Sequence, residues 1–310
     1  MIVYRELATI ERELGFPLKT LYGISNNLDS HYRSVRIPKK SGKNRTLSVP
    51  DEILKKVQRA IVEKLLVFRP VSRYATAYKP SASVVRNAVK HVGKEKLLKL
   101  DILHFFDSVL YSTVKEKVFP AEIFSEKIRV LLSMLCYYKE VLPQGAPSSP
   151  MITNIILYDF DEAVGKWCCD QGITYTRYCD DMTFSGHFEE DDVIMYITDE
   201  LQKRGFFLNH KKTALVPKGK QQKVTGIVVN QKLNVAREYK REIRKEVYFV
   251  EKFGVKEHVA HIASSLTPEG YLNRLLGKIG FVLSVCPDDA SMQAMQKTIL
   301  HQLQQLHTQA

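Results

Sequence analysis

Two adjacent aspartates, Asp180 and Asp181, are the residues of this sequence best suited to carry chemistry. They follow Tyr178-Cys179 and lie between two runs with the composition of short strands, 174–178 and 182–185. Carboxylates this close repel each other, so the pair is unfavourable unless positive charge lies near it. A divalent metal such as Mg²⁺, which prefers oxygen ligands, supplies that charge. A solvated Asp-Asp turn at the tip of a hairpin explains the same two residues equally well.

The position of a third carboxylate, Asp101, favours the interpretation as a metal site over that as a solvated turn. Asp101 ends the mostly apolar run Leu97–Leu100, as a charged residue at the end of a buried strand would. A buried carboxylate needs a partner. If this strand lies beside the 174–185 hairpin, Asp101 faces Asp180, and three carboxylates can hold two Mg²⁺ ions roughly 3.5–4 Å apart. Such ions activate an attacking hydroxyl group and stabilise a leaving pyrophosphate.

The distribution of charge is typical of a protein that binds a polyanion around an acidic centre. The net charge is +12, and residues 1–100 hold 21 Lys and Arg against 8 Asp and Glu. Residues 151–200 hold 2 against 12, whereas residues 201–250 hold 13 against 3. Binding to a nucleic acid explains this charge distribution. Charged residues that merely lie on separate solvent-exposed faces would explain it too.

Other features of the composition narrow the class of protein. The sequence contains no uninterrupted apolar run of about 18 residues, so we expect no membrane partner. Its five cysteines are odd in number and form no CxxC pair. This argues against a disulfide framework or a zinc site and favours a reducing, cytoplasmic location.

The elements that must position the carboxylates alternate between strand and helix. Residues 32–38 and 45–49 are predicted to be two strands joined by a basic turn, and residues 52–68 to form a helix with an apolar face. A buried strand is predicted at 97–101 and a buried helix at 151–164. Residues 237–253 are predicted to form a basic amphipathic helix, with helical structure continuing toward Ala310. The class is therefore α+β with a helical C-terminal region.

The chain resembles a reverse transcriptase over most of its length, in segments of the right order and spacing. These segments are Lys99-Leu100-Asp101-Ile102 with Phe105-Phe106, the loop 142–150 (LPQGAPSSP), Tyr178-Cys179-Asp180-Asp181, and Gly205 through Asn209-His210-Lys211-Lys212-Thr213. Cys179 stands where many bacterial relatives carry alanine. Because both side chains are small, we expect no loss of activity from it.

Two further matches make the chain similar to the retron reverse transcriptases. Asn87-Ala88-Val89-Lys90-His91 fits their NAxxH motif, and Val224-Thr225-Gly226 fits their VTG motif. A group II intron-like or unassigned reverse transcriptase is an alternative, which these two motifs argue against. A non-catalytic, polymerase-like scaffold that binds RNA is another alternative. A scaffold without catalytic activity would not need three carboxylates that repel one another when brought together, which argues against this alternative.

The resemblance implies a right-hand polymerase. Residues 1–96 would form an N-terminal helix and the fingers, residues 97–229 the palm, and residues 230–310 a helical thumb. The enzyme would copy part of its own structured non-coding RNA into DNA, starting from a guanosine 2′-hydroxyl group and leaving a branched RNA–DNA product. Its partners would be that RNA, the DNA product, deoxynucleoside triphosphates and a separate effector protein in defence against phages.

The resemblance also implies roles for single residues. Asp101, Asp180 and Asp181 would bind two Mg²⁺ ions, with the main-chain carbonyl of Ile102 as a further ligand. Nucleotide contacts would come from the triphosphate-binding Lys43 and Arg45, the 2′-hydroxyl-excluding Phe106, the pocket residues Gln144 and Gly145, and the proton donor Lys212, for which Lys211 is an alternative. RNA contacts would come from Asn87, His91, Val224, Thr225, Gly226, Lys240, Arg241 and Arg244.

Overall fold

The chain folds into two compact units, each built from two separate stretches of sequence. The computed structural model describes residues 3–38, 42, 44–262 and 264–308. The first unit comprises Met1–Ala82 and Leu98–Leu215, and the second comprises Ser83–Leu97 and Val216–Ala310.

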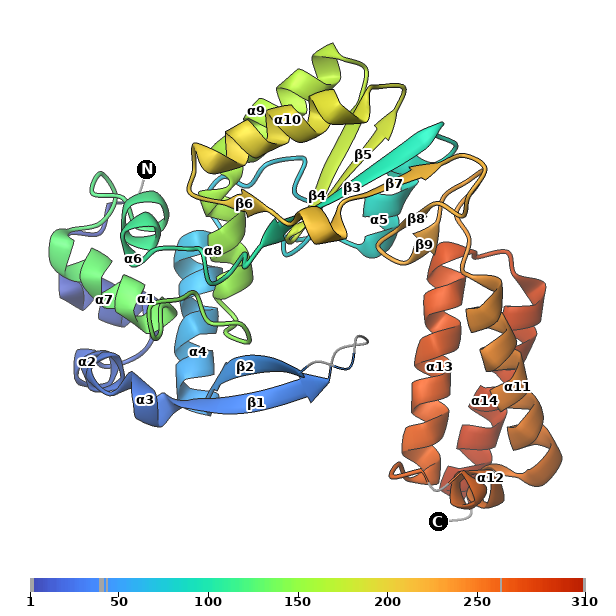
Figure 1. Ribbon diagram of the computed structural model, residues 1–310. Coiled ribbons are helices and arrows are strands. Elements are labelled where there is room, and N and C mark those ends of the chain that lie inside the picture. Colours follow the sequence, from blue (N-terminus) through green and yellow to red (C-terminus); the bar gives the residue numbers. More distant parts are fainter. Residues whose placement is uncertain (1–2, 39–41, 43, 263, 309–310) are drawn as a thin grey trace. The chain divides into compact units, whose positions relative to one another are not determined.

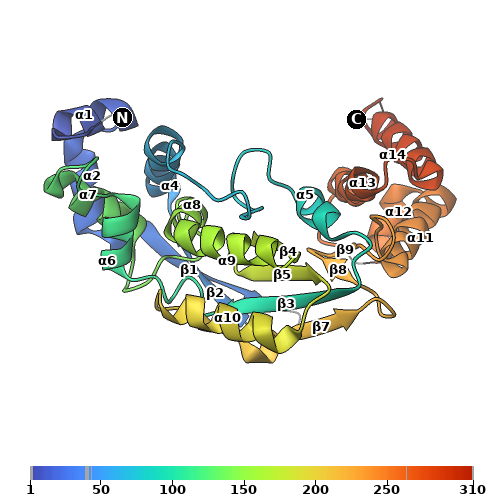
Figure 2. The ribbon, with the colours of Figure 1, turned by 90° about the horizontal axis from the view of Figure 1, so that it is seen from above.

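A five-stranded sheet forms the centre of the first unit. The strand order is β4-β5-β3-β6, and β7 also pairs with β3. The strands are β3 (Lys96–Leu103), β4 (Thr174–Tyr178), β5 (Asp181–Gly186), β6 (Phe207–Leu208) and β7 (Ala214–Pro217). Helices α9 (Tyr158–Asp170) and α10 (Glu190–Gln202) pack beside each other against this sheet (Figures 1 and 2).

The core beneath these helices comes from alternate residues of the strands. Leu98, Leu100 and Ile102 of β3 lie on one side of the strand because side chains alternate along it. All three are buried and belong to one apolar cluster with Phe160 of α9 and Phe184 of β5. This packing fixes the part of β3 that carries Asp101.

The remaining elements of the first unit are a long hairpin and a set of helices. The hairpin pairs β1 (Tyr32–Pro38) with β2 (Asn44–Pro50) in antiparallel register. The helices are α1 (Leu7–Leu14), α2 (Leu18–Asn26), α3 (Leu28–His31), α4 (Glu52–Ala60), α6 (Tyr111–Thr113), α7 (Glu126–Cys136) and α8 (Ser149–Ile156), with a 3₁₀ turn at His210–Lys212.

Two predicted helices of this unit differ in detail from the observed ones. The helix predicted over 52–68 is α-helical only as far as Ala60 and continues as π-helical turns over Ile61–Leu66; a second π-helical stretch covers Val114–Val118. The helix predicted over 151–164 is interrupted at Leu157, where ψ is 8°, and so forms α8 and α9.

The second unit combines a small α/β part with a helical bundle. The small part consists of α5 (Val84–Ala88), a 3₁₀ turn (Val89–His91) and the hairpin β8 (Lys223–Val224) and β9 (Ile227–Val228). The bundle consists of α11 (Arg237–Phe253), α12 (Val255–His261), α13 (Pro268–Val285) and α14 (Ala290–Thr308). Ile243, Val247 and Val250 of α11 are buried, as predicted.

The α+β class with a helical C-terminal region is confirmed. The boundaries between the two observed units differ from the expected domain boundaries at 96 and 229. Residues 83–97 join the C-terminal part because α5 packs against the β8–β9 hairpin. Within the described stretches, none of the helices combines the length and the apolar character needed to cross a membrane.

Candidate active site

The paired aspartates lie at a tight turn between two strands. Tyr178 at the end of β4 pairs with Asp181 at the start of β5, so Cys179 and Asp180 form the turn. Cys179 has a φ of 62°, a left-handed conformation that costs a residue with a side chain about 1–2 kcal/mol. The main-chain N–H of Ile102 donates to the carbonyl of Asp180 at 3.2 Å, which ties the turn to β3.

Asp101 lies beside this turn, as the sequence predicted, and is held by two neighbours. Its side chain is 5% exposed. Asn209 Nδ2 donates to Asp101 Oδ1 at 3.0 Å, and Lys212 Nζ donates to Asp101 Oδ2 at 2.6 Å. Asn209 belongs to a segment singled out in the sequence, but its role in orienting Asp101 becomes visible only in the fold.

The three carboxylates disturb one another electrostatically. The pKa of Asp181 is raised to about 6, first by desolvation and next by the charges of Asp180 and Asp101, while Lys212 acts in the opposite direction. A cation bound between these carboxylates would reverse the part of the pKa shift that comes from their mutual repulsion. Partial burial lowers the pKa of Lys212, but its hydrogen bond to Asp101 and the carboxylate charges raise it overall.

The chemistry of this donor set fits a hard divalent cation. All three side chains offer oxygen donors, and their repulsion calls for positive charge. Among the residues that the structure describes, no three His, Cys, Asp or Glu side chains already surround a point suited to a metal ion. In this arrangement Lys212 supplies the positive charge next to Asp101.

A cavity of about 600 Å³ brings together most of the residues predicted to bind the metal ions and the nucleotide. It lies within the first unit, between the β1–β2 hairpin and the carboxylates. The predicted residues that line it are Arg45, Asp101, Ile102, Phe106, Gln144, Asp180, Asp181 and Lys212. Lys211 is not among the lining residues, whereas Tyr78, which the sequence did not single out, is. Lys43 lies outside the described residues.

The two phenylalanines after Asp101 lie in different environments. Phe105 is 3% exposed and belongs to the core. Phe106 is only partly buried, lines the cavity and packs edge-on against Phe105 with ring centroids 5.2 Å apart.

Gly145 has a different structural role from the one expected. It does not line the cavity in the described structure. Its φ is 116°, and a Cβ atom at this position would lie 3.0 Å from the main-chain oxygen of Ser48. The close approach that requires glycine is therefore to β2, which carries Arg45 into the cavity.

The NAxxH and VTG segments meet in the second unit, although they are far apart in sequence. Thr225, with a φ of 47°, donates from Oγ1 to the carbonyl of Val84 at 3.1 Å, and Val224 is buried. Asn87 and His91 are 1% and 0% exposed. Burial lowers the pKa of His91 to about 3, with the charges of Lys90 and Lys94 adding to the effect, so this ring is neutral.

These positions correct the expected RNA contacts. The side chains of Asn87 and His91 are enclosed because α5 and the following turn pack on β8 and β9, so neither faces solvent. Lys240 is also engaged within the unit: its Nζ donates to Asp289 at 3.0 Å and to Asn234 at 2.8 Å, and its side chain is 13% exposed. Arg241, Arg244 and Gly226 are exposed.

Comparisons with known proteins agree with this site. The family "Reverse transcriptase (RNA-dependent DNA polymerase)" matches residues 37–229. The Escherichia coli retron Ec86 reverse transcriptase is 30% identical over 83% of this chain and 82% of its own length. The Escherichia coli retron Ec83 reverse transcriptase is 31% identical over 83% of this chain and 84% of its own length.

Similarity to solved structures is weaker. A foamy viral protease–reverse transcriptase solved with double-stranded DNA aligns with a TM-score of 0.44 and 14% identity, over 98% of this chain and 49% of that one. This overlap adds nothing to the assignment, which depends on the family match and the retron relatives. The chain belongs to the retron-type reverse transcriptases and is an RNA-directed DNA polymerase.

Proposed function

We propose that Asp101, Asp180 and Asp181 bind two Mg²⁺ ions at the polymerase active site, together with the main-chain carbonyl of Ile102. The observation that carries this proposal is the meeting of three mutually repelling oxygen donors in one cavity of about 600 Å³. Bound there, the ions would lower the pKa of the attacking hydroxyl group and stabilise charge on the leaving pyrophosphate.

The other lining residues suit a deoxynucleoside triphosphate. Arg45 on β2 would contact phosphate oxygens, for which a planar guanidinium group is well shaped. Phe106 would lie beneath the sugar and exclude a 2′-hydroxyl group, and Gln144 would line the pocket beside it. Of the two adjacent lysines, Lys212 is the proposed proton donor to pyrophosphate, because it lines the cavity with a raised pKa and so holds its proton at Nζ.

The parts of the molecule take the names of a polymerase hand in this proposal. Residues 1–96 form the N-terminal helix and fingers, residues 97–229 the palm and residues 230–310 the thumb. Residues 83–97 and 216–229 are exceptions in position, since both stretches belong to the same compact unit as residues 230–310. The meeting of residues 83–97 with Val224–Gly226 suits a single RNA-recognition element in which Gly226 is exposed and Asn87 and His91 support it from inside.

The product proposed for this enzyme is a branched RNA–DNA molecule. Synthesis begins at a guanosine 2′-hydroxyl group within a structured non-coding RNA, and part of that RNA serves as the template. Membership of the retron family supports this proposal. The complex of enzyme, RNA and DNA, joined by a separate effector protein in the cytoplasm, would serve in defence against phages.

The test is to express the chain with its native flanking DNA and isolate small DNA from the cells. We expect a DNA that stays linked to RNA under denaturing conditions and shifts in mobility after ribonuclease treatment. Replacing the branching guanosine by adenosine should abolish it. DNA that carries no covalently attached RNA would contradict branched priming while leaving the polymerase activity itself intact.

A further inference from the structure

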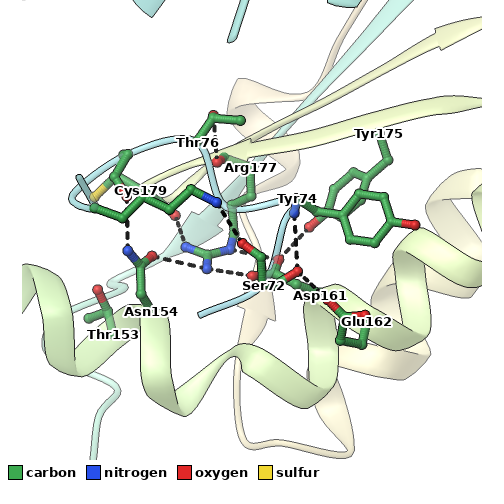
Figure 3. A network of polar contacts seen from close by, with 12 residues as sticks. Ser72, Tyr74, Thr76, Thr153, Asn154, Asp161, Glu162, Tyr175, Arg177 and Cys179 are labelled. Carbon is green, nitrogen blue, oxygen red and sulfur yellow. Dashed lines mark hydrogen bonds and ion pairs between the residues drawn. The ribbon is translucent and has the colours of Figure 1, made fainter. Parts of the chain in front are cut away.

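Arg177 is the bulkiest of the fully buried side chains in the described structure, and the reaction outlined above gives it no task. It lies on β4, two residues before Cys179, and is 0% exposed. Figure 3 shows its guanidinium group at the centre of a polar network that joins α8 and α9 to the turn bearing Asp180.

The guanidinium group binds in two directions. On one side, Nε and Nη2 donate to the two carboxylate oxygens of Asp161 at 2.8 and 2.6 Å, and Asp161 is itself 0% exposed. On the other side, Nη1 donates to the main-chain carbonyl of Cys179 at 2.8 Å. Arg177 therefore connects helix α9 with the turn.

The groups that hold this network are themselves buried. Tyr175 donates from its hydroxyl group to Asp161 at 2.8 Å, and Asn154 accepts from Arg177 Nη2 at 3.2 Å. Thr76 donates from its main-chain N–H and its hydroxyl group to the carbonyl of Arg177 at 2.8 and 2.9 Å. The guanidinium group is thus fixed from α8 and α9, and the main chain of Arg177 is fixed from the segment around Thr76.

The turn needs such support because Cys179 adopts a left-handed conformation that its side chain disfavours. The carbonyls of the two turn residues are each held by a different neighbour. Arg177 holds that of Cys179, and the N–H of Ile102 holds that of Asp180. A buried ion pair is seldom needed for stability, since apolar residues of similar volume often replace one without loss. This favours a role for Arg177 in the turn itself.

We propose that Arg177 is a positioning residue of the polymerase reaction: by fixing the Cys179 carbonyl, it sets where the carboxylates of Asp180 and Asp181 lie. It contacts neither the substrate nor the reacting atoms. The proposal rests on the assignment of Asp180 and Asp181 as metal ligands. Its test therefore has to separate a failure of that assignment from a failure of positioning.

The test replaces the whole buried network by apolar groups, in the variant Arg177→Met, Asp161→Leu, Tyr175→Phe. No charge or hydroxyl group of these three residues is then left buried without a partner. We expect the variant to fold, with a melting temperature close to that of the wild type. A misplacement of about 1 Å is enough to cost about 100-fold in rate, so we expect kcat to fall about 100-fold.

Two readouts distinguish positioning from a merely structural role. The Mg²⁺ concentration that gives half-maximal rate should rise, whereas KM for deoxynucleotides and Kd for RNA should stay near their wild-type values. Arg129→Met is the matched control, because Arg129 is a buried arginine of the same unit that binds Glu126 and the carbonyl of Phe119 outside the cavity. It should leave kcat of the folded enzyme unchanged.

A second variant, Arg177→Lys, keeps the charge beside Asp161 but cannot reach both partners, so its kcat should fall as well. A folded Arg177 variant with wild-type kcat and Mg²⁺ dependence would overturn the proposal. Unfolding of both variants would also overturn it, since Arg177 would then serve the fold. If Asp180→Asn remains active, the metal assignment fails instead; that result is separate from the outcome with Arg177.

Discussion

Replacing Gly145 by alanine tests whether the loop before α8 fixes the position of β2. The φ of 116° lies in a region that only glycine occupies readily, and the new Cβ atom would meet the main-chain oxygen of Ser48 at 3.0 Å. Such backbone strain costs about 1–3 kcal/mol, or roughly 2–12 °C in melting temperature for a unit of this size. The main chain of Ser48 is paired with Ser34 of β1. The loop and β2 must therefore move apart to make room for the new Cβ atom.

The kinetic consequence follows from what these segments carry. Gln144 and Arg45 line the cavity, so KM for deoxynucleotides is expected to rise up to about tenfold, the equivalent of about 1.4 kcal/mol. Thermal unfolding and single-nucleotide incorporation on an RNA template measure both effects. Gly205→Ala is the control, since Gly205 has a φ of 76° but open space around it. Because Gly205→Ala carries the strain of a positive φ without the contact to Ser48, an identical KM in the two variants would refute this reasoning.

Three other predictions concern the pocket, the basic helix and the buried histidine. Phe106→Val is expected to admit ribonucleotides, and an unchanged ratio of kcat/KM for deoxy- and ribonucleotides would leave Phe106 as a packing residue only. Neutralising Arg241 and Arg244 should weaken binding of all RNAs and flatten the salt dependence by about one unit per lost phosphate contact, whereas Lys240→Gln should lower stability without changing that slope; equal slopes in the two variants would contradict the assignment. The pKa of His91 is lowered to about 3 in the folded protein, so between pH 6.5 and pH 5 a proton binds to this histidine in the unfolded chain but not in the folded one. The free energy of unfolding should therefore fall by about 1.5 kcal/mol from pH 6.5 to pH 5. Urea unfolding at the two pH values measures this drop, which His91→Gln should lose.

Periodicity and composition predicted the elements whose own sequence determines them. The strand at 32–38 and the helix at 237–253 have the predicted bounds, because alternating and helical apolar patterns are local properties. The convergence of Asp101 with Asp180 was also predictable, since a carboxylate at the end of a buried strand needs a partner nearby.

The features that the sequence did not predict depend on contacts between distant segments. Exposure at the NAxxH segment is decided by the packing of α5 on β8 and β9, so the burial of Asn87 and His91 could not be inferred from the motif. The engagement of Lys240 by Asp289 across 49 residues is of the same kind. The sequence does contain one signal for Arg177: residues 151–200 hold 12 Asp and Glu but only 2 Lys and Arg, of which Arg177 is one.

The most direct test of the account compares Asp180→Asn with the wild type in RNA-templated DNA synthesis, with RNA binding measured in the same preparations. The substitution keeps the size of the side chain and removes the charge proposed to bind Mg²⁺. DNA synthesis by the Asp180→Asn enzyme should be abolished, while Kd for RNA and the melting temperature should stay near their wild-type values. DNA synthesis near the wild-type rate by the Asp180→Asn enzyme would contradict it.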